Sequence, residues 1–167
     1  MTTNNENWYV IHTLSRKENV VYENLTKKYF NAYLPIVSKD FLRSGKVISS
    51  KRPLISNYVF VSTTKEKLPQ LNFIVGSNRL LSNDGKPVTV TEKEMGWMKQ
   101  LCCYDPIPQV VGRYQKGQKV KITSGILSGI EGEIVKFSKK TQIVICCGLP
   151  GYNFIVDIER ESLEEVE

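Results

Sequence analysis

Residues 52–62 read RPLISNYVFVS and contain the clearest strand pattern in the first half of the chain. Side chains alternate between the two faces of a strand, so Tyr58 and Phe60 share one face, and Val59 and Val61 share the other. Small aliphatic side chains such as these valines suit a sheet face packed beneath helices. The aromatic side chains can then form an apolar patch on the opposite face.

Toward the N-terminus, residues 8–14 (WYVIHTL) predict a second strand, because aromatic and β-branched residues dominate them. Alternation puts Val10 and His12 on the same face of this strand. Ser15 stands where a helix N-cap is expected. Apolar residues at helical spacing across residues 16–30 then predict a helix with one buried stripe.

The middle of the chain is rich in turn signals. Residues 40–51 predict a basic hairpin around the Ser-Gly pair at residues 44–45. The Asn-Asp-Gly sequence at residues 83–85 is a strong turn signal. Residues 91–94 (TEKE) match a capping box, which predicts the start of a helix. We expect this helix to run to about residue 101.

A loss of hydrophobic periodicity after residue 102 predicts a boundary between two domains. Residues 102–114 lack hydrophobic periodicity and contain Pro106 and Pro108, which cannot continue a helix. We interpret this stretch as a linker between a first domain at residues 7–101 and a second at residues 115–166. Short strands separated by glycine turns in the second domain predict a small β barrel, which removes exposed strand edges.

Charge divides the chain in the same way. The 167 residues carry a formal net charge of +6. Residues 1–101 hold 15 Lys and Arg against 8 Asp and Glu, whereas residues 115–167 hold 7 against 8. The positive field of the first part attracts polyanions. The polar N-terminus is no signal peptide, and no apolar run suits a membrane span, so we expect a cytoplasmic protein without membrane partners.

The cysteines and the single histidine argue against catalysis and against metal binding. The cysteines form two adjacent pairs, Cys102-Cys103 and Cys146-Cys147, a spacing that does not suit zinc, and His12 is the only histidine. We interpret the cysteines as mostly buried thiols. Nucleophile elbows, phosphate loops and paired acid–histidine arrangements are also missing. We therefore predict no enzyme, no cofactor and no metal.

Two sets of motifs resemble one family. Residues 116–137 (KGQKVKITSGILSGIEGEIVKF) resemble a KOW motif, with glycines at Gly125 and Gly132. Glycine at these turn positions permits positive φ and a tight bend at a barrel corner. The stretches WYVIHTLSRKE, RPLISNYVFV and TEKEM resemble the N-terminal domain of the NusG/RfaH family. Their order and spacing extend the resemblance over residues 8 to about 165.

This resemblance implies an α+β fold: an N-terminal α/β sandwich of an antiparallel sheet with helices, followed by a small SH3-like KOW β barrel. It implies a monomeric transcription elongation factor or antiterminator that binds the β′ clamp helices of RNA polymerase. The polymerase-binding patch would consist of Val10, His12, Ile55, Tyr58 and Phe60. The alternative is that both faces of the sheet are core and no patch exists.

Two further contacts follow from the resemblance. Arg16, Lys17, Lys27 and Lys28 would touch the non-template DNA strand; the alternative is a solvated basic helix face. In the loop at residues 148–151, Leu149 looks exposed and would contact a ribosomal protein or a termination factor. The alternative there is an ordinary β turn.

Within the family the chain looks closest to the specialised paralogues. Ser56-Asn57 stands where housekeeping members tend to have Pro-Gly, and residues 102–108 (CCYDPIP) are similar to the linker of the UpxY group, which antiterminates long polysaccharide operons. RfaH can hold its C-terminal domain as a helical hairpin. Here β-branched residues and glycines favour a permanent β barrel.

The competing function is that of a KOW-containing ribosomal or translation protein that binds RNA. Such a protein needs a basic barrel, because phosphate contacts supply much of the affinity for RNA. The net charge of −1 over residues 115–167 instead favours a protein partner for the second domain.

Overall fold

A computed structural model describes residues 5–112, 117–137 and 140–167 of the chain. The end of the expected linker, at residues 113–114, and the first residue of the KOW motif lie outside this range. The chain divides into two compact units, residues 1–92 and 93–167, which are described separately. Antiparallel sheets with few helices make up both units, which confirms the predicted mixed class.

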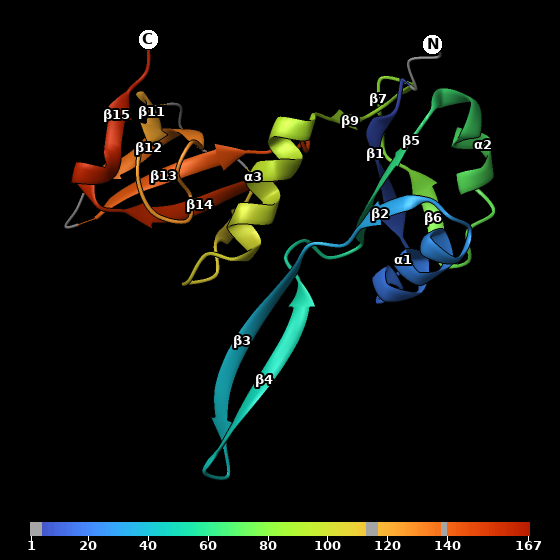
Figure 1. Cartoon of the computed structure of the whole chain (residues 1–167), viewed down its shortest axis with the longest axis horizontal. Helices are drawn as coiled ribbons and strands as arrows, with labels where there is room; N and C mark the ends of the chain where they lie inside the picture. Colours follow the sequence, from blue (N-terminus) through green and yellow to red (C-terminus); the bar gives the residue numbers. More distant parts are fainter. Residues whose placement is uncertain (1–4, 113–116, 138–139) are drawn as a thin grey trace. The chain divides into compact units, whose positions relative to one another are not determined.

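The first unit is built on a five-stranded antiparallel sheet (Figure 1). Its strands are β1 (Asn7–Thr13), β2 (Asn31–Tyr33), β5 (Tyr58–Thr63), β6 (Ser77–Leu80) and β9 (Thr89–Val90). They follow the order β2-β5-β1-β6, and β9 also pairs with β1. Strand β1 is therefore central, with β5 as its longest partner.

Helices cover one face of this sheet. They are α1 (Glu18–Lys27), a 3₁₀ turn η1 (Lys65–Lys67) and the short α2 (Leu68–Leu71). Val59 and Val61 of β5 lie in one buried cluster with Val21 and Leu25 of α1 and Leu71 of α2. The prediction that these two valines face the helices is confirmed.

The predicted start of the first helix is wrong. The helix begins at Glu18 rather than directly after Ser15, and its N-cap residue Lys17 makes no side-chain capping bond. Leu14 donates its amide to Gly76 O at 2.9 Å, and Arg16 has a φ of 59°. This tertiary bond holds the chain extended beyond β1, so an additional turn precedes the helix.

The predicted basic hairpin is present and longer than expected. Among the described residues, strands β3 (Ile36–Arg43) and β4 (Lys46–Pro53) pair only with each other, and Figure 1 shows the hairpin extending away from the sheet. Ser44 and Gly45 both have positive φ, as a type I′ turn requires. The same pattern at Asp84 and Gly85 joins β7 (Ser82–Asn83) to β8 (Lys86–Pro87).

The second unit contains a six-stranded antiparallel sheet. Its strands are β10 (Gln109–Val111), β11 (Lys119–Ile122), β12 (Glu131–Phe137), β13 (Thr141–Cys146), β14 (Asn153–Ile158) and β15 (Leu163–Glu165), with a 3₁₀ turn η2 (Arg160–Ser162) before the last. The strand order is β10-β14-β13-β12-β11-β15. The strand-rich prediction for this segment is confirmed, whereas closure into a separate barrel stays a prediction.

Helix α3 (Glu92–Cys102) accompanies this sheet in the second unit. The Gln100 side chain donates from Nε2 to Ile126 O at 3.1 Å and to Ser128 O at 3.0 Å. The ammonium of Lys93 lies 3.6 Å from Glu131 Oε1. These contacts join both ends of the helix to the loop and strand that follow β11.

The described part of the expected linker, residues 102–112, is more ordered than its composition predicts. Within residues 102–114, strand β10 pairs with β14, and Tyr104 Oη donates to Asp157 O at 2.6 Å. The prolines exclude a helix, and β10 follows them at the edge of the second sheet. The domain limits at residues 7–101 and 115–166 stay a prediction.

Candidate functional site

The pairing of β1 with β5 defines the candidate interaction face. Val10 lies opposite Phe60 and His12 opposite Tyr58, so these four side chains share the sheet face that α1 does not cover. The His12 and Tyr58 rings meet edge to face, with centroids 5.5 Å apart and planes at 70°. The predicted alternation of these two strands is confirmed, whereas the role of this face as a binding patch stays a prediction.

The apolar side chains of this face are buried. Val10 and Phe60 have no exposed surface, Ile55 is 2% exposed and Tyr58 is 7% exposed, whereas His12 is half-buried. This burial fits the alternative in which both sheet faces are packed. A partner can therefore bind Val10 or Phe60 only after this face is uncovered.

His12 supplies the polar edge of the face. Asn78 Nδ2 lies 3.1 Å from His12 Nδ1. In this contact the amide nitrogen can donate to Nδ1 when the ring carries its proton on Nε2. The ring can therefore donate to a carbonyl or a carboxylate. Among the described residues, no group of His, Cys, Asp and Glu could hold a metal ion.

The four predicted DNA-binding residues lie at opposite ends of α1. Arg16 and Lys17 precede the helix, Lys27 is its last residue and Lys28 its C-cap, and all four are exposed. A ten-residue helix is about 15 Å long, so the cations form two pairs rather than one patch. At the C-terminal end, Lys27 also complements the helix dipole, which is the structural alternative for it.

The two glycines of the KOW motif have different roles. Gly125 has a φ of 80° and open space around it, as predicted for a turn glycine. Gly132 lies inside β12, where an added Cβ would come within 2.5 Å of Ile143 Cγ2 and 2.6 Å of Val144 O. The interpretation of Gly132 as a turn glycine is therefore wrong. It permits the close approach of β12 to β13.

The expected exposure of Leu149 is also wrong. Leu149 is only 5% exposed, although residues on either side of it, Gly148 and Pro150, are exposed. Gly148 and Gly151 both have positive φ, and the turn they form directs the leucine inward. The loop therefore presents turn residues rather than an apolar contact.

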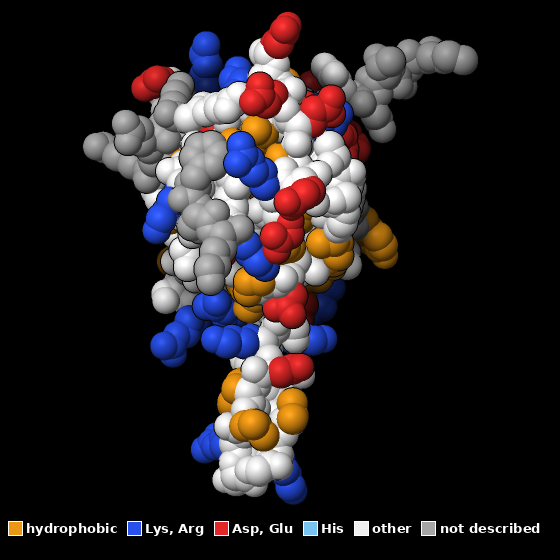
Figure 2. All heavy atoms as spheres, turned by 90° about the vertical axis from the view of Figure 1, so that its left-hand side faces the viewer, with side chains coloured by type: hydrophobic (Ala, Val, Ile, Leu, Met, Phe, Trp, Pro, Cys, Tyr) orange, Lys and Arg blue, Asp and Glu red, His pale blue; other side chains and the backbone are white. Residues whose placement is uncertain are grey.

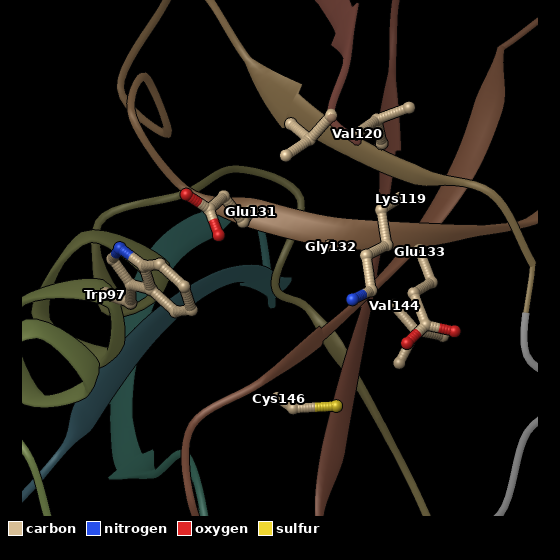
Figure 3. A pocket seen from close by; sticks show the side chains of 9 residues that line it. Trp97, Lys119, Val120, Glu131, Gly132, Glu133, Val144 and Cys146 are labelled. Atoms are coloured by element: carbon tan, nitrogen blue, oxygen red, sulfur yellow. The ribbon is translucent and has the colours of Figure 1, made fainter.

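A small cavity lies between α3 and the second sheet (Figure 3). It has a volume of about 170 Å³ and is lined by Trp97, Glu131, Glu133, Lys119 and Cys146, among others. Lys93 lies 5.1 Å from the centre of the Trp97 ring. Small-molecule sites usually exceed about 300 Å³, so this cavity is too small for one.

The cysteines are less uniformly buried than expected. Cys147 is buried and Cys102 half-buried, but Cys103 and Cys146 are exposed, so the interpretation of mostly buried thiols is wrong for two of the four. Burial, followed by the nearby charge of Glu94, raises the pKa of the Cys147 thiol to about 12. A thiol with this pKa stays protonated and is not a nucleophile.

One surface was not anticipated in the sequence. Phe41, Leu42, Val47 and Ile48 are 44%, 76%, 69% and 38% exposed at the far end of the β3–β4 hairpin. Figure 2 shows hydrophobic and basic side chains gathered together at this end. The signal was present in the sequence as apolar residues adjoining the Ser44-Gly45 turn of a basic hairpin.

The comparisons with known proteins agree on one family. Residues 6–99 match the sequence model of a family described as transcription termination factor nusG. The chain belongs to the NusG family. It is 24% identical to the transcription termination/antitermination protein NusG of Halalkalibacterium halodurans, over 96% of this chain and 99% of that protein.

A solved structure of NusG from Thermotoga maritima shares the fold. Its TM-score is 0.58 at 23% identity, over 97% of this chain and 98% of the other. The family match spans β1 and β5 and therefore includes the candidate interaction face. No helix in the described part of this NusG-family chain is long and apolar enough to cross a bilayer.

Proposed function

We propose that this NusG-family chain is a transcription elongation factor and antiterminator that binds RNA polymerase and suppresses pausing or termination. The family match over residues 6–99 carries this proposal. It includes the paired strands on which Val10, His12, Tyr58 and Phe60 share one face. The protein acts by binding as a cytoplasmic monomer, and no catalytic step belongs to it.

The β1/β5 face is the proposed contact for the β′ clamp helices of the polymerase. Aromatic and aliphatic residues with a polar edge are typical of an interface core, and large aromatic residues contribute much of the binding energy. Once this face is uncovered, Val10, Phe60 and Ile55 would supply the apolar area. Tyr58 and His12 would supply the hydrogen-bonding edge.

Suppression of pausing then follows from a population shift. A factor that binds the elongating polymerase more tightly than the paused polymerase moves the equilibrium toward elongation. The size of that shift is limited by the difference between the two affinities. No chemistry on a substrate is needed.

The cations around α1 are proposed to contact the non-template DNA strand. Arg16 and Lys17 at one end and Lys27 and Lys28 at the other would bind phosphates about 15 Å apart. Phosphate contacts position a strand without reading its sequence. Specific recognition would require bases splayed onto the domain.

Residues 115–166 of the second unit are proposed to form an SH3-like KOW barrel that contacts a ribosomal protein or a termination factor. Its near-neutral charge favours a protein over RNA. Ser56-Asn57 and the linker at residues 102–108 support membership of the specialised UpxY-like group, which serves long polysaccharide operons. Asn57 has a φ of 67°, so this position uses the positive φ that glycine adopts most easily.

Truncation of Tyr58 tests the polymerase contact. A large aromatic residue in an interface core typically costs about 2 kcal/mol or more on truncation, so Tyr58→Ala should weaken binding to a clamp-helix fragment about thirtyfold. Tyr22→Ala is the matched control, because Tyr22 lies on α1 and is 37% exposed. Thermal unfolding of both variants checks the fold. Unchanged affinity of a folded Tyr58→Ala protein would remove this face from the interface.

A further inference from the structure

One edge of β14 is covered by residues 104–112, which we call the strap. On one side β14 pairs with β13 along its whole length, and on the other side it pairs with the three residues of β10. Two side-chain hydrogen bonds extend this cover beyond β10. Asn153 donates from Nδ2 to Gly112 O at 2.8 Å. Tyr104 donates from Oη to Asp157 O at 2.6 Å. The strap therefore closes this edge of β14 from Asn153 to Asp157.

The edge beneath the strap has no protection of its own. The sequence of β14 is NFIVDI, with four apolar residues, one carboxylate and neither lysine nor proline. Its pairing with β13 has no register shift, so no bulge twists the strand away. Natural sheets keep their edges from pairing with other chains by short strands, charges, prolines and bulges. An uncovered β14 is therefore a template for a further strand.

The strap supplies the protection that β14 lacks. Its strand β10 has only three residues, and Pro106 and Pro108, which precede it, have no N–H to donate to another strand. The strand at the opposite edge of the second sheet, β15, is equally short and carries two carboxylates. Both edges are therefore protected while the strap is bound, and its removal opens one of them.

The uncovered edge is complementary to a second copy of itself. When two β14 strands run antiparallel with Ile155 opposite Ile155 of the second copy, Asn153 of each copy lies opposite Asp157 of the other. The Asn153 amide can donate to the Asp157 carboxylate, because directly opposed side chains lie close together. Phe154 then lies opposite Val156, and both are already buried in the single chain. No like charges oppose each other in this register, and two-fold symmetry presents the same patch on both copies.

We propose that the strap competes with a second copy of this chain for the edge of β14. With the strap bound the protein is a monomer, and when the strap leaves two copies pair through β14 into a two-fold dimer. The strap is part of the same molecule, so its high effective concentration favours the monomer. The dimer covers both open edges, which stops assembly at two copies. This inference goes beyond the proposed function and does not depend on it.

Weakening of the strap tests the proposal in the full chain. Tyr104→Phe removes the hydroxyl that binds Asp157, and Val110→Gly removes the side chain opposite Phe154. Two straps must leave for each dimer, so both losses count twice. We expect analytical ultracentrifugation to give the double variant a dimer dissociation constant at least about tenfold below that of the wild type. Hydrogen exchange at residues 109–111 checks that the strap opens, and thermal unfolding checks that the protein stays folded.

A third substitution determines where the two copies meet. Ile155→Lys, added to the double variant, places two ammonium groups opposite each other at the two-fold axis and should restore the monomer. Ile126→Lys is the matched control, because Ile126 is 53% exposed in the loop between β11 and β12 and should leave the dimer intact. A dimer that survives Ile155→Lys, or that Ile126→Lys abolishes equally, would overturn the proposal. A folded double variant with an open strap that stays monomeric, or that forms larger assemblies, would also overturn it.

Discussion

Glu18 holds the backbone of Asn57: its Oε1 accepts a hydrogen bond from the Asn57 amide at 2.8 Å. The carbonyl oxygen of the same residue, Asn57 O, accepts a hydrogen bond from the Thr13 amide at 2.8 Å. Glu18 begins α1 and is only 8% exposed. The end of β1, the start of α1 and the entry into β5 are therefore joined at one point beside the candidate interaction face.

Replacement of Glu18 should destabilise the first unit. Glu18→Ala leaves the Asn57 amide without its acceptor, and an unsatisfied buried donor costs about 1–3 kcal/mol. Glu18→Gln should cost less, because its amide oxygen can still accept. Urea unfolding measures both, with Glu23→Ala as an exposed control on the same helix. Equal stability of the Glu18→Ala and Glu23→Ala proteins would show that the contact contributes nothing.

The conformation of Asn57 gives a second prediction. Asn57 has a φ of 67°, and a side chain with a Cβ costs roughly 1–2 kcal/mol in the left-handed region unless it is Asn or Asp. Asn57→Ala should therefore lower the free energy of unfolding by about 1 kcal/mol, whereas Asn57→Gly should leave it nearly unchanged. The critical result is that the Asn57→Gly protein is more stable than the Asn57→Ala protein, because helix or strand propensity alone gives the opposite order.

Gly132 and Gly125 should respond differently to substitution. A Cβ on Gly132 would overlap Ile143 and the Val144 carbonyl, so Gly132→Ala should cost about 1–3 kcal/mol. Gly125 needs only positive φ, which Asn tolerates, so Gly125→Asn should cost less than about 1 kcal/mol despite its larger side chain. Chemical denaturation of the two variants compares them. A larger loss of stability in Gly125→Asn than in Gly132→Ala would contradict the roles assigned to the two glycines.

Local patterns in the sequence were enough for much of the fold. Alternation in residues 58–61 assigned the two faces of β5, and the turn residues at 44–45 and 83–85 located two hairpins, because these features depend on near neighbours. The contact between Glu18 and Asn57 spans 39 residues and leaves no periodic signal. Gly132 resembled a turn glycine because its crowding comes from β13, and Leu149 resembled a surface residue because burial depends on the packed structure.

The candidate site shows the same division. The pairing of Val10 with Phe60 was predictable as a shared face, because alternation fixes it. The burial of both side chains was not, since the sequence does not state what packs on a face. The exposed apolar residues at the far end of the β3–β4 hairpin were not predicted as a surface, because the segment was interpreted from its basic residues alone. Apolar residues in such a hairpin become informative only when the structure shows that they are exposed and that no other described strand pairs with the hairpin.

Tyr9 provides a test of the sheet core. Its ring is buried in the cluster beneath α1, and its hydroxyl has no hydrogen-bond partner in the part of the chain that the structure describes. A buried hydroxyl without a partner costs about 1–3 kcal/mol, so Tyr9→Phe should raise the free energy of unfolding by about 1 kcal/mol. Tyr22→Phe, on the exposed side of α1, should leave it unchanged. A destabilised Tyr9→Phe protein would show that the hydroxyl is hydrogen-bonded in solution.

The cysteines should differ in reactivity as they differ in exposure. Cys103 and Cys146 are exposed, and iodoacetamide should label them in the folded protein at pH 8. Cys147 is buried and its pKa is raised, so it should be labelled only after unfolding. Mass spectrometry of peptides before and after addition of urea measures each site. Labelling of Cys147 at the rate of Cys103 would contradict its burial.

The raised pKa of Cys147 also predicts a pH dependence of stability. The folded-state pKa of about 12 lies above the ordinary value of 9.0, so folding favours the protonated thiol. Below pH 9 both states are protonated and the contribution is complete. Above pH 9 the unfolded chain loses this proton first, and stability falls by up to about 1.4 kcal/mol per pH unit.

Two cysteine variants test this pH dependence. The stability of Cys147→Ala should decline less steeply between pH 9 and 10.5 than that of Cys103→Ala, in which the buried thiol remains. The two proteins share all other titrating groups, so identical slopes would mean that Cys147 does not titrate differently in the folded state.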